Sequence, residues 1–221
     1  MENVNFAKRR LRASGSSLGF AFCILTFALN CFAQDIKQPN VSGAFYPDNP
    51  QELSRMIDGF IGAAKPQPET GDIFALISPH AGYGFSGSTA AFGYKLIKLR
   101  PYKTVIVIGT SHQYGFSAVS VYPQGAFRTP LGDLEIDKEF TQKLLGIDKE
   151  IFFEPAAFEK EHSVEVQLPF LQKSLSGFKI VPIVMGDCTL SLCQKLAGLL
   201  QEAIGGRKDV LVIASTDMYH G

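Results

Sequence analysis

Short apolar runs alternate with segments of helical spacing along most of this chain of 221 residues. The apolar runs are rich in valine and isoleucine and are bounded by glycine, proline or polar residues, which is typical of strands. We expect strands over residues 73–78, 104–108, 117–122, 178–185 and 210–214. Elsewhere apolar residues recur every three or four positions, which predicts helices over residues 50–64, 88–99, 162–175 and 190–204 and a further helix beginning near Asp137.

The order of these elements predicts the fold class. Strands that are apolar on both faces need cover on both faces. Helices between successive strands provide that cover and allow the strands to run parallel. We therefore expect an α/β fold with a mainly parallel or mixed sheet and helices on both faces.

Glycine and proline positions give four further expectations. Residues 80–87 are rich in glycine and predict a loop, and residues 127–137 predict a loop that leads into the helix near Asp137. Pro169 predicts a kink or an early break in the helix that begins at His162. Pro182 predicts that its strand lies at an edge of the sheet or that the proline lies at a strand end.

The first 33 residues have the pattern of a signal peptide. A basic cluster at 8–12 is followed by an apolar run at 20–29, and Ala33 offers a cleavage site before Gln34. The apolar run is too short to span a bilayer comfortably, so we expect no membrane span in the mature chain. These features predict a secreted or periplasmic protein; a lipoprotein beginning at Cys31 is the less favoured alternative, because Asn30 suits lipidation poorly.

The remaining residues, 34–221, are enough for one α/β domain with its own core. The chain ends at Gly221, directly after the last predicted strand and the loop that carries His220. An apolar strand with nothing after it lacks a covering helix. We therefore expect this domain to be truncated at its C-terminus.

Composition excludes some partners. The chain has 21 Lys and Arg against 21 Asp and Glu and no basic stripe, which argues against a nucleic-acid partner. Cys188 and Cys193 flank the start of a predicted helix, and we interpret them as structural thiols.

Three of the four histidines follow predicted strands: His80, His112 and His220. A single histidine in such a place commonly bonds the backbone of its own loop. Ligands of open α/β sheets bind outside the carboxyl ends of the strands, however, and imidazole is a common ligand of catalytic metals. Three equivalent placements therefore predict one site, and Asp217 can orient an imidazole there or serve as a ligand.

The fourth histidine, His162, lies in an acidic segment that contains Glu165. Two interpretations remain open: the carboxylates orient metal-binding imidazoles, or they belong to a solvated first turn of a helix. Tyr83 also has two interpretations, as a hydrogen-bond donor in the ligand pocket or as a residue of loop packing. Imidazoles with a carboxylate suit Fe(II), Zn(II) or Cu.

Six ordered motifs make the pattern specific. They occupy residues 43–47, 77–83, 109–112, 127–134, 161–170 and 214–221. In this order they resemble the Memo family, which is named for a mediator of ErbB-driven cell motility and whose bacterial members are called AmmeMemoRadiSam system protein B. The resemblance spans about residue 41 to residue 221. No P-loop, dinucleotide fingerprint or nucleophile elbow competes with it.

The resemblance implies a fold like that of the class III extradiol dioxygenases, which are non-haem iron enzymes. By motif, His80 and His112 match the two metal-binding histidines, and His220 matches the catalytic acid/base histidine beside the metal. The third ligand of the family, a cysteine in a later motif, has no match in this sequence. The resemblance thus implies an Fe(II) or Cu protein with dioxygenase-like redox activity and with radical-SAM system partners. The alternative is a non-catalytic protein that binds a peptide or a small ligand in the same pocket.

Overall fold

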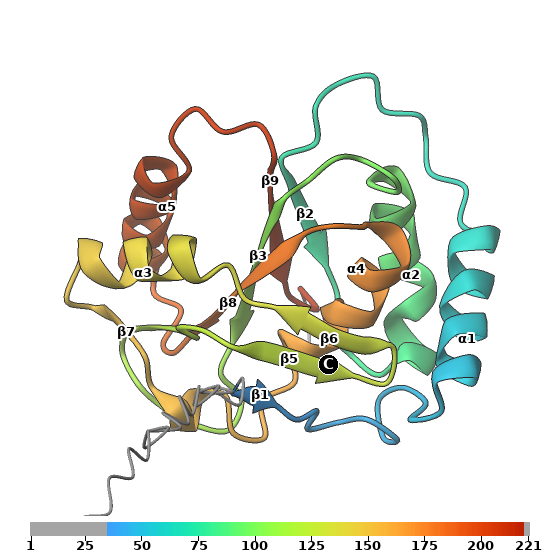
Figure 1. The fold of residues 1–221 in the computed structure, drawn as a ribbon, viewed down its shortest axis with the longest axis horizontal. Helices are drawn as coiled ribbons and strands as arrows, with labels where there is room; N and C mark the ends of the chain where they lie inside the picture. The colour runs from blue at the N-terminus through green and yellow to red at the C-terminus, as the bar shows by residue number, and fades with distance from the viewer. Residues whose placement is uncertain (1–34, 219–221) are drawn as a thin grey trace, which may run out of the picture. The chain divides into compact units, whose positions relative to one another are not determined.

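The strands of the computed structural model, which describes residues 35–218, form two sheets (Figure 1). The strands are β1 (Ile36–Lys37), β2 (Ala75–Ser78), β3 (Thr104–Thr110), β4 (Val119–Val121), β5 (Ala126–Thr129), β6 (Gly132–Glu135), β7 (Ile151–Phe152), β8 (Lys179–Met185) and β9 (Val210–Ser215). The larger sheet has the order β2-β9-β3-β8-β4-β7, and all neighbouring strands in it are parallel except β4 and β8. The smaller sheet has the order β1-β5-β6.

Helices cover both faces of the larger sheet (Figure 1). They are α1 (Pro50–Ala63), α2 (Tyr83–Leu96), α3 (Lys138–Ile147), α4 (Leu168–Ser174) and α5 (Leu190–Ile204), with short 3-10 turns η1 (Pro155–Ala157) and η2 (Glu165–Gln167). Helices α1, α2 and α4 pack together on one face, and α3 packs with α5 on the other. The predicted α/β fold is confirmed.

The two helical layers explain why the central strands are apolar throughout. In β3, Val105 and Val107 belong to the core shared with α1, α2 and α4, whereas Ile106 belongs to the core shared with α3 and α5. Strand β9 lies between β2 and β3 and divides in the same way, with Leu211 on the first face and Val210 on the second. Alternate side chains of one strand are therefore buried on opposite faces of the sheet.

The helix predicted over 88–99 begins earlier than expected. Helix α2 starts at Tyr83, so most of the glycine-rich segment 80–87 is helical and the predicted loop was wrong there. Gly87 faces Phe60 of α1, and a Cβ built on this glycine would lie 2.6 Å from the ring. This glycine serves the close packing of two helices instead of a loop conformation.

The loop predicted over 127–137 was also wrong. Strands β5 and β6 form an antiparallel hairpin there, and Gly132 closes its turn with a φ of +120°. The helix near Asp137 is confirmed, because the carboxylate of Asp137 accepts the backbone N–H of Phe140 and caps α3. In a strand of four residues, the alternation of apolar and polar positions is too short to distinguish the strand from a loop.

Proline positions differ from expectation at two places. The helix expected from His162 starts only at Leu168, after η2, and Pro169 lies in its first turn, where the missing N–H costs nothing. Strand β8 is an interior strand, although Pro182 predicted an edge or an end. The proline is tolerated because the pairing of β8 with β4 ends at Ile183. No ladder hydrogen bond to β4 therefore requires an N–H group at Pro182.

Several expectations fall outside residues 35–218. The signal peptide and His220 lie there, and both remain predictions. Within the described residues, no helix combines the length and the apolar character that crossing a membrane requires. Cys188 and Cys193 are exposed free thiols.

Candidate metal centre

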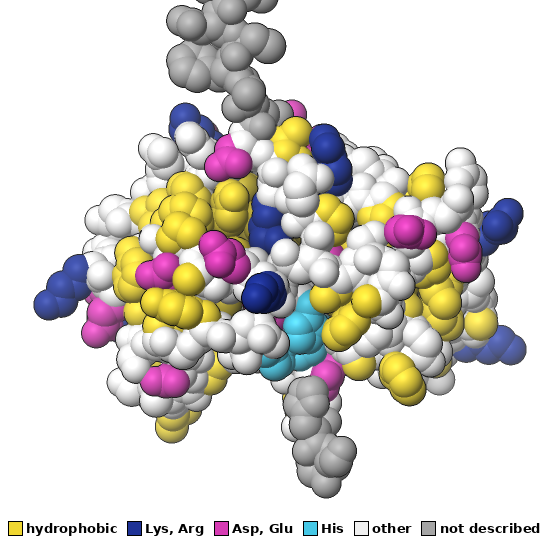
Figure 2. Space-filling view, turned by 90° about the horizontal axis from the view of Figure 1, so that it is seen from below, with side chains coloured by type: hydrophobic (Ala, Val, Ile, Leu, Met, Phe, Trp, Pro, Cys, Tyr) yellow, Lys and Arg dark blue, Asp and Glu magenta, His cyan; other side chains and the backbone are white. Residues whose placement is uncertain are grey.

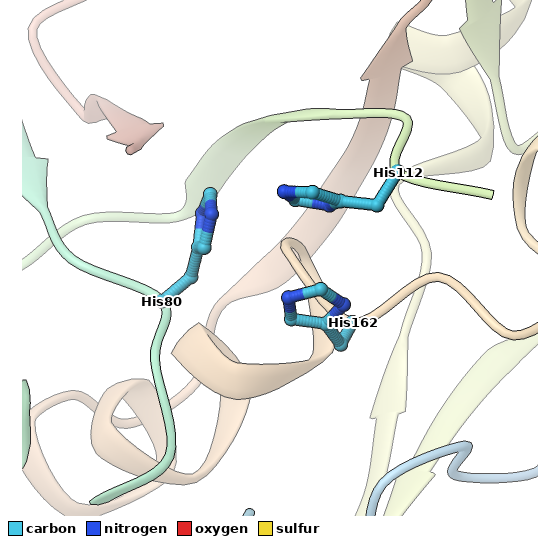
Figure 3. Close-up of side chains that lie close together, drawn as sticks. All are labelled: His80, His112 and His162. Carbon is cyan, nitrogen blue, oxygen red and sulfur yellow. The ribbon is translucent and has the colours of Figure 1, made fainter. Parts of the chain in front are cut away.

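Three histidines meet at the carboxyl edge of the larger sheet (Figure 3). His80 follows β2, His112 follows β3, and His162 lies between η1 and η2. Each offers a ring nitrogen within 4.8 Å of those of the other two. The ring centroids are 5.1 Å apart for His80 and His112, 5.5 Å for His80 and His162, and 4.5 Å for His112 and His162.

Parallel pairing brings the first two histidines together. Strands β2 and β3 flank β9 and run in the same direction as β9, so all three end at the same edge. His80 and His112 each stand two residues beyond the last residue of their strand. This placement agrees with the expectation from the sequence that the two residues share a site.

A close backbone approach holds His162 beside them. The hydroxyl of Ser163 donates to the carbonyl of Thr110 at the end of β3, at 2.9 Å. A Cβ built on Gly109 would lie 2.1 Å from this hydroxyl oxygen. Only glycine at this position allows the segment that carries His162 to lie directly on the end of β3.

The carboxylate of Glu161 ties His112 to the His162 segment. It is buried and accepts the backbone N–H groups of His112 at 2.6 Å, His162 at 2.8 Å and Ser163 at 2.8 Å. Burial raises the pKa of Glu161, but the hydrogen bonds from His112 and Ser163 outweigh burial, and the pKa lies below its ordinary value. Glu161 is therefore ionised at neutral pH.

Glu161 also fixes the tautomer of His112. The Nδ1 atom of His112 lies 3.0 Å from Oε1 of Glu161. An ionised carboxylate only accepts hydrogen bonds, so Nδ1 carries the proton. The lone pair of the neutral ring then resides on Nε2, which is the arrangement that supporting carboxylates impose on metal-binding histidines.

Ser215 fixes the tautomer of His80 in the same sense. Its hydroxyl donates to the carbonyl of Ser163 at 2.6 Å and accepts from the side-chain amide of Gln167 at 2.8 Å. A hydroxyl has one proton, and Ser215 donates it to the carbonyl of Ser163. In the contact of 3.1 Å between Ser215 and Nδ1 of His80, the histidine N–H is therefore the donor. The lone pair of the ring then resides on Nε2.

Asp217 completes the polar surroundings of His80. One carboxylate oxygen accepts the backbone N–H groups of His80 at 2.6 Å and Ala81 at 3.1 Å. The other lies 3.8 Å from Nε2 of His80. Asp217 thus fixes the loop after β2 and places a negative charge beside the histidine cluster.

Burial keeps two of the imidazoles neutral. It is the main cause that lowers the pKa of His80 and of His162, although the charges of Asp217 and Glu161 oppose it. Both rings are therefore in the form that binds metals at neutral pH. His80 is fully buried, whereas the side chains of His112 and His162 are 26% and 16% exposed, so the cluster opens to solvent on their side (Figure 2).

The cluster fits a transition metal in ligand type and fits it in size after a modest contraction. Three nitrogens on one ion at about 2.0–2.1 Å lie about 3.0–3.6 Å apart. The ring nitrogens, now within 4.8 Å of one another, would therefore approach by up to about 1–2 Å, which side-chain rotations supply. Imidazole suits Fe, Cu and Zn alike, so the geometry does not select one of them.

Comparison with known proteins decides the family. Residues 37–221 match the sequence profile of the family described as Memo-like protein. The chain belongs to this family. A MEMO1 family protein of Methanobrevibacter smithii is 38% identical in an alignment 197 residues long that covers 84% of this chain and 70% of the relative. MEMO1 family proteins of Caldivirga maquilingensis and Thermotoga neapolitana are each 35% identical, over 68% and 70% of their own lengths and over 83% and 84% of this chain.

Two further residues that the sequence placed in the pocket have other contacts in this Memo-like chain. Glu165 is buried and accepts the backbone N–H groups of Asn40 and Val41 and the hydroxyl of Tyr46, so it holds the segment after β1. Tyr83 is buried in the core, and its hydroxyl donates to the carbonyl of Val166. Both residues therefore support the backbone that surrounds the histidines.

Sequence reasoning missed several residues that build the Memo-like site. The sequence left open that a carboxylate of this acidic segment orients an imidazole, and Glu161 does so for His112, but nothing distinguished Glu161 from its neighbours before its burial was known. Ser163, Gln167 and Ser215 were also missed, because serine and glutamine occur in most loops and helices. Their one signal is position: each lies within five residues of a candidate histidine or aspartate.

Proposed function

We propose that this Memo-like protein holds one Fe or Cu ion with His80 and His112 as ligands and His162 beside them as a third imidazole. One observation carries the proposal. The Nδ1 atoms of His80 and His112 both donate to buried acceptors, so both rings present Nε2 lone pairs in a shared cluster. Support of this kind is typical of metal-binding histidines.

Charge favours a cation over an anionic ligand in this cluster. Glu161 is ionised there and Asp217 contributes a second carboxylate, whereas the buried imidazoles are neutral. A divalent cation balances two carboxylates. A phosphorylated peptide would instead bring further negative charge to a site with no cation of its own among these residues.

A bound Fe or Cu ion would supply Lewis acidity and one-electron redox chemistry, which supports a dioxygenase-like oxidoreductase. The protein contributes orientation: Glu161 and Ser215 fix the rings, and Asp217 fixes the loop of His80. The partly exposed His112 and His162 leave a path for a small molecule. By its motif, His220 is proposed to move protons during the reaction.

Metal titration of single variants tests the proposal. His80→Ala and His112→Ala should each weaken Fe(II) and Cu binding by more than the about 10–100-fold that loss of a supporting contact costs. Gln113→Ala, at an exposed position next to His112, is the matched control and should bind like the wild type. Wild-type affinity in both histidine variants would contradict the proposal and favour a pocket for a peptide or small ligand.

A further inference from the structure

A groove of about 750 Å³ lies at the other edge of the larger sheet, where β3 and β8 begin. Its walls come from the N-terminal turn of α3, the region after α5, and the loops that precede β3 and β8. Helices α3 and α5, which frame it, lie side by side in Figure 1. This volume is within the usual range of small-molecule sites. The histidine cluster stands at the carboxyl edge, so the two regions are separate.

Cations dominate the lining of the groove. Five basic residues contribute to it, on four different segments: Lys103, Lys138, Lys143, Lys179 and Arg207. Only two carboxylates, those of Asp137 and Glu139, share the lining. The chain as a whole has a net charge of zero, so this concentration is local.

The basic residues of the groove differ in how they are held. Arg207 is held by Asp209 at 2.9 Å and Lys179 by Glu135 at 3.2 Å, both at the rim of the groove. Lys143 donates to the carbonyl of Ala203. Among residues 35–218, by contrast, the ammonium groups of Lys103 and Lys138 make no hydrogen bond or salt bridge, and both residues are exposed. The charge of Lys103 still contributes to the lowered pKa of Asp209.

Lys138 lies where a cation is unfavourable, although Asp137 and Glu139 in the same turn offset part of the cost. It is the first residue of α3, where the positive end of the helix dipole repels a cation. The same field attracts an anion placed between Lys138 and Lys103. Cations that make no salt bridge, gathered around a concave surface, suit a ligand that brings negative charge.

The groove also contains a fixed guanidinium. Nη2 of Arg207 donates to the hydroxyl of Thr104 at 2.9 Å, and this hydroxyl donates to Asp137 at 2.7 Å. Thr104 is buried, so the chain of hydrogen bonds holds Arg207 at the wall. Nε and Nη2 also donate to Asp209, at 2.9 Å and 3.2 Å, which leaves Nη1 to donate to a phosphate oxygen.

From these contacts we propose that the groove binds a phosphorylated small molecule, with Lys103 and Lys138 as its main charge partners and Arg207 as a fixed wall. This site is independent of the metal centre. It gives the protein a second ligand at the opposite edge of the sheet.

Calorimetric titration with inorganic pyrophosphate at low ionic strength tests the proposal, using the whole chain in metal-free buffer. The double variant Lys103→Gln/Lys138→Gln should bind about tenfold more weakly, since each exposed ion pair is worth a few-fold in affinity. Lys65→Gln/Lys149→Gln removes the same charge from exposed positions outside the groove and should retain affinity within about twofold.

Two outcomes would overturn the proposal. One is equal pyrophosphate affinity in the groove variant and the wild type. The other is loss of binding in His80→Ala/His112→Ala, which would place the anion at the metal centre. Amide chemical shifts of the wild-type protein give a second measurement that needs no variant. Pyrophosphate should move the signals of Thr104 and Gly177, which line the groove. Unchanged signals at these two residues would also contradict the proposal.

Discussion

At the scale of single residues, Glu161 makes many contacts in the site, although the sequence did not single it out. Its carboxylate accepts three backbone N–H groups and the ring N–H of His112, and thereby links His112 to the segment of His162. Ser215 has the same role for His80. In the proposed site the histidines supply the ligating atoms, and these buried acceptors decide which nitrogen each ring presents.

Glu161→Gln should weaken metal binding by about 10–100-fold, which is the usual cost of a lost supporting contact. The amide cannot accept all four hydrogen bonds, and its NH2 group is directed at a donor. Metal titration of the variant measures the effect. Glu159→Gln, an exposed neighbour in the same acidic segment, is the control and should leave affinity unchanged. Equal affinities in both variants would remove Glu161 from the site.

The buried histidines should make the metal-free protein less stable in mild acid. Burial lowers the pKa values of His80 and His162, so the unfolded chain binds protons first as the pH falls below about 6.5. Stability is therefore present above this pH and falls as the pH drops from about 6.5 toward the folded pKa values. Urea unfolding at several pH values measures the slope. His162→Gln should flatten it, and an unchanged slope would contradict the assignment of His162.

At the scale of elements, the site depends on how close one loop lies to one strand. The segment 161–163 rests on the end of β3 because Gly109 leaves room for Ser163. This contact sets the position of His162 relative to His112. The packing of the strand and the loop is therefore part of the proposed metal centre.

Gly109→Ala should destabilise the fold by about 1–3 kcal/mol, because the new methyl group would overlap Ser163 and force the loop away. It should also weaken metal binding. Gly198→Ala is a control of opposite sign: it lies inside α5 with open space around it, and alanine should stabilise the helix by about 0.5–1 kcal/mol. Thermal and urea unfolding give both values. A stable, metal-binding Gly109→Ala protein would show that the loop adapts.

Long elements could be predicted from the sequence, and short ones could not. Helix α5 and the strands β3 and β9 have runs of one period long enough to identify them. The β5–β6 hairpin has four residues in each strand, and the early start of α2 depends on Gly87 packing against Phe60. His80 and His112 followed from their places after strands. Glu161 and Ser215 did not, because burial and tautomer arise only when distant segments meet.

At the scale of the whole molecule, one sheet carries two chemically different regions at its two edges. The carboxyl edge gathers imidazoles and carboxylates, and the other edge gathers cations around a groove. A cation and an anion can therefore bind the same chain without competing for charge partners. The described sheet and its two helical layers provide the fixed separation between them.

Export is a prediction that concerns the complete chain. The basic cluster at 8–12 and the apolar run at 20–29 predict cleavage after Ala33, so a mature protein should begin at Gln34 and be found outside the cytoplasm. N-terminal sequencing of protein from its native host measures this. A mature chain that begins with lipidated Cys31 would select the alternative, and one that begins with Met1 in the cytoplasm would refute export.

The central claim is that imidazoles of this cluster bind one metal ion. X-ray absorption at the metal edge, on protein purified without added metals and then loaded with one equivalent of Fe(II) or Cu, tests it most directly. We predict at least two imidazole nitrogens at about 2.0–2.1 Å, with the count falling in His80→Ala and in His112→Ala. A spectrum without imidazole ligation, or one that neither substitution changes, would contradict the account.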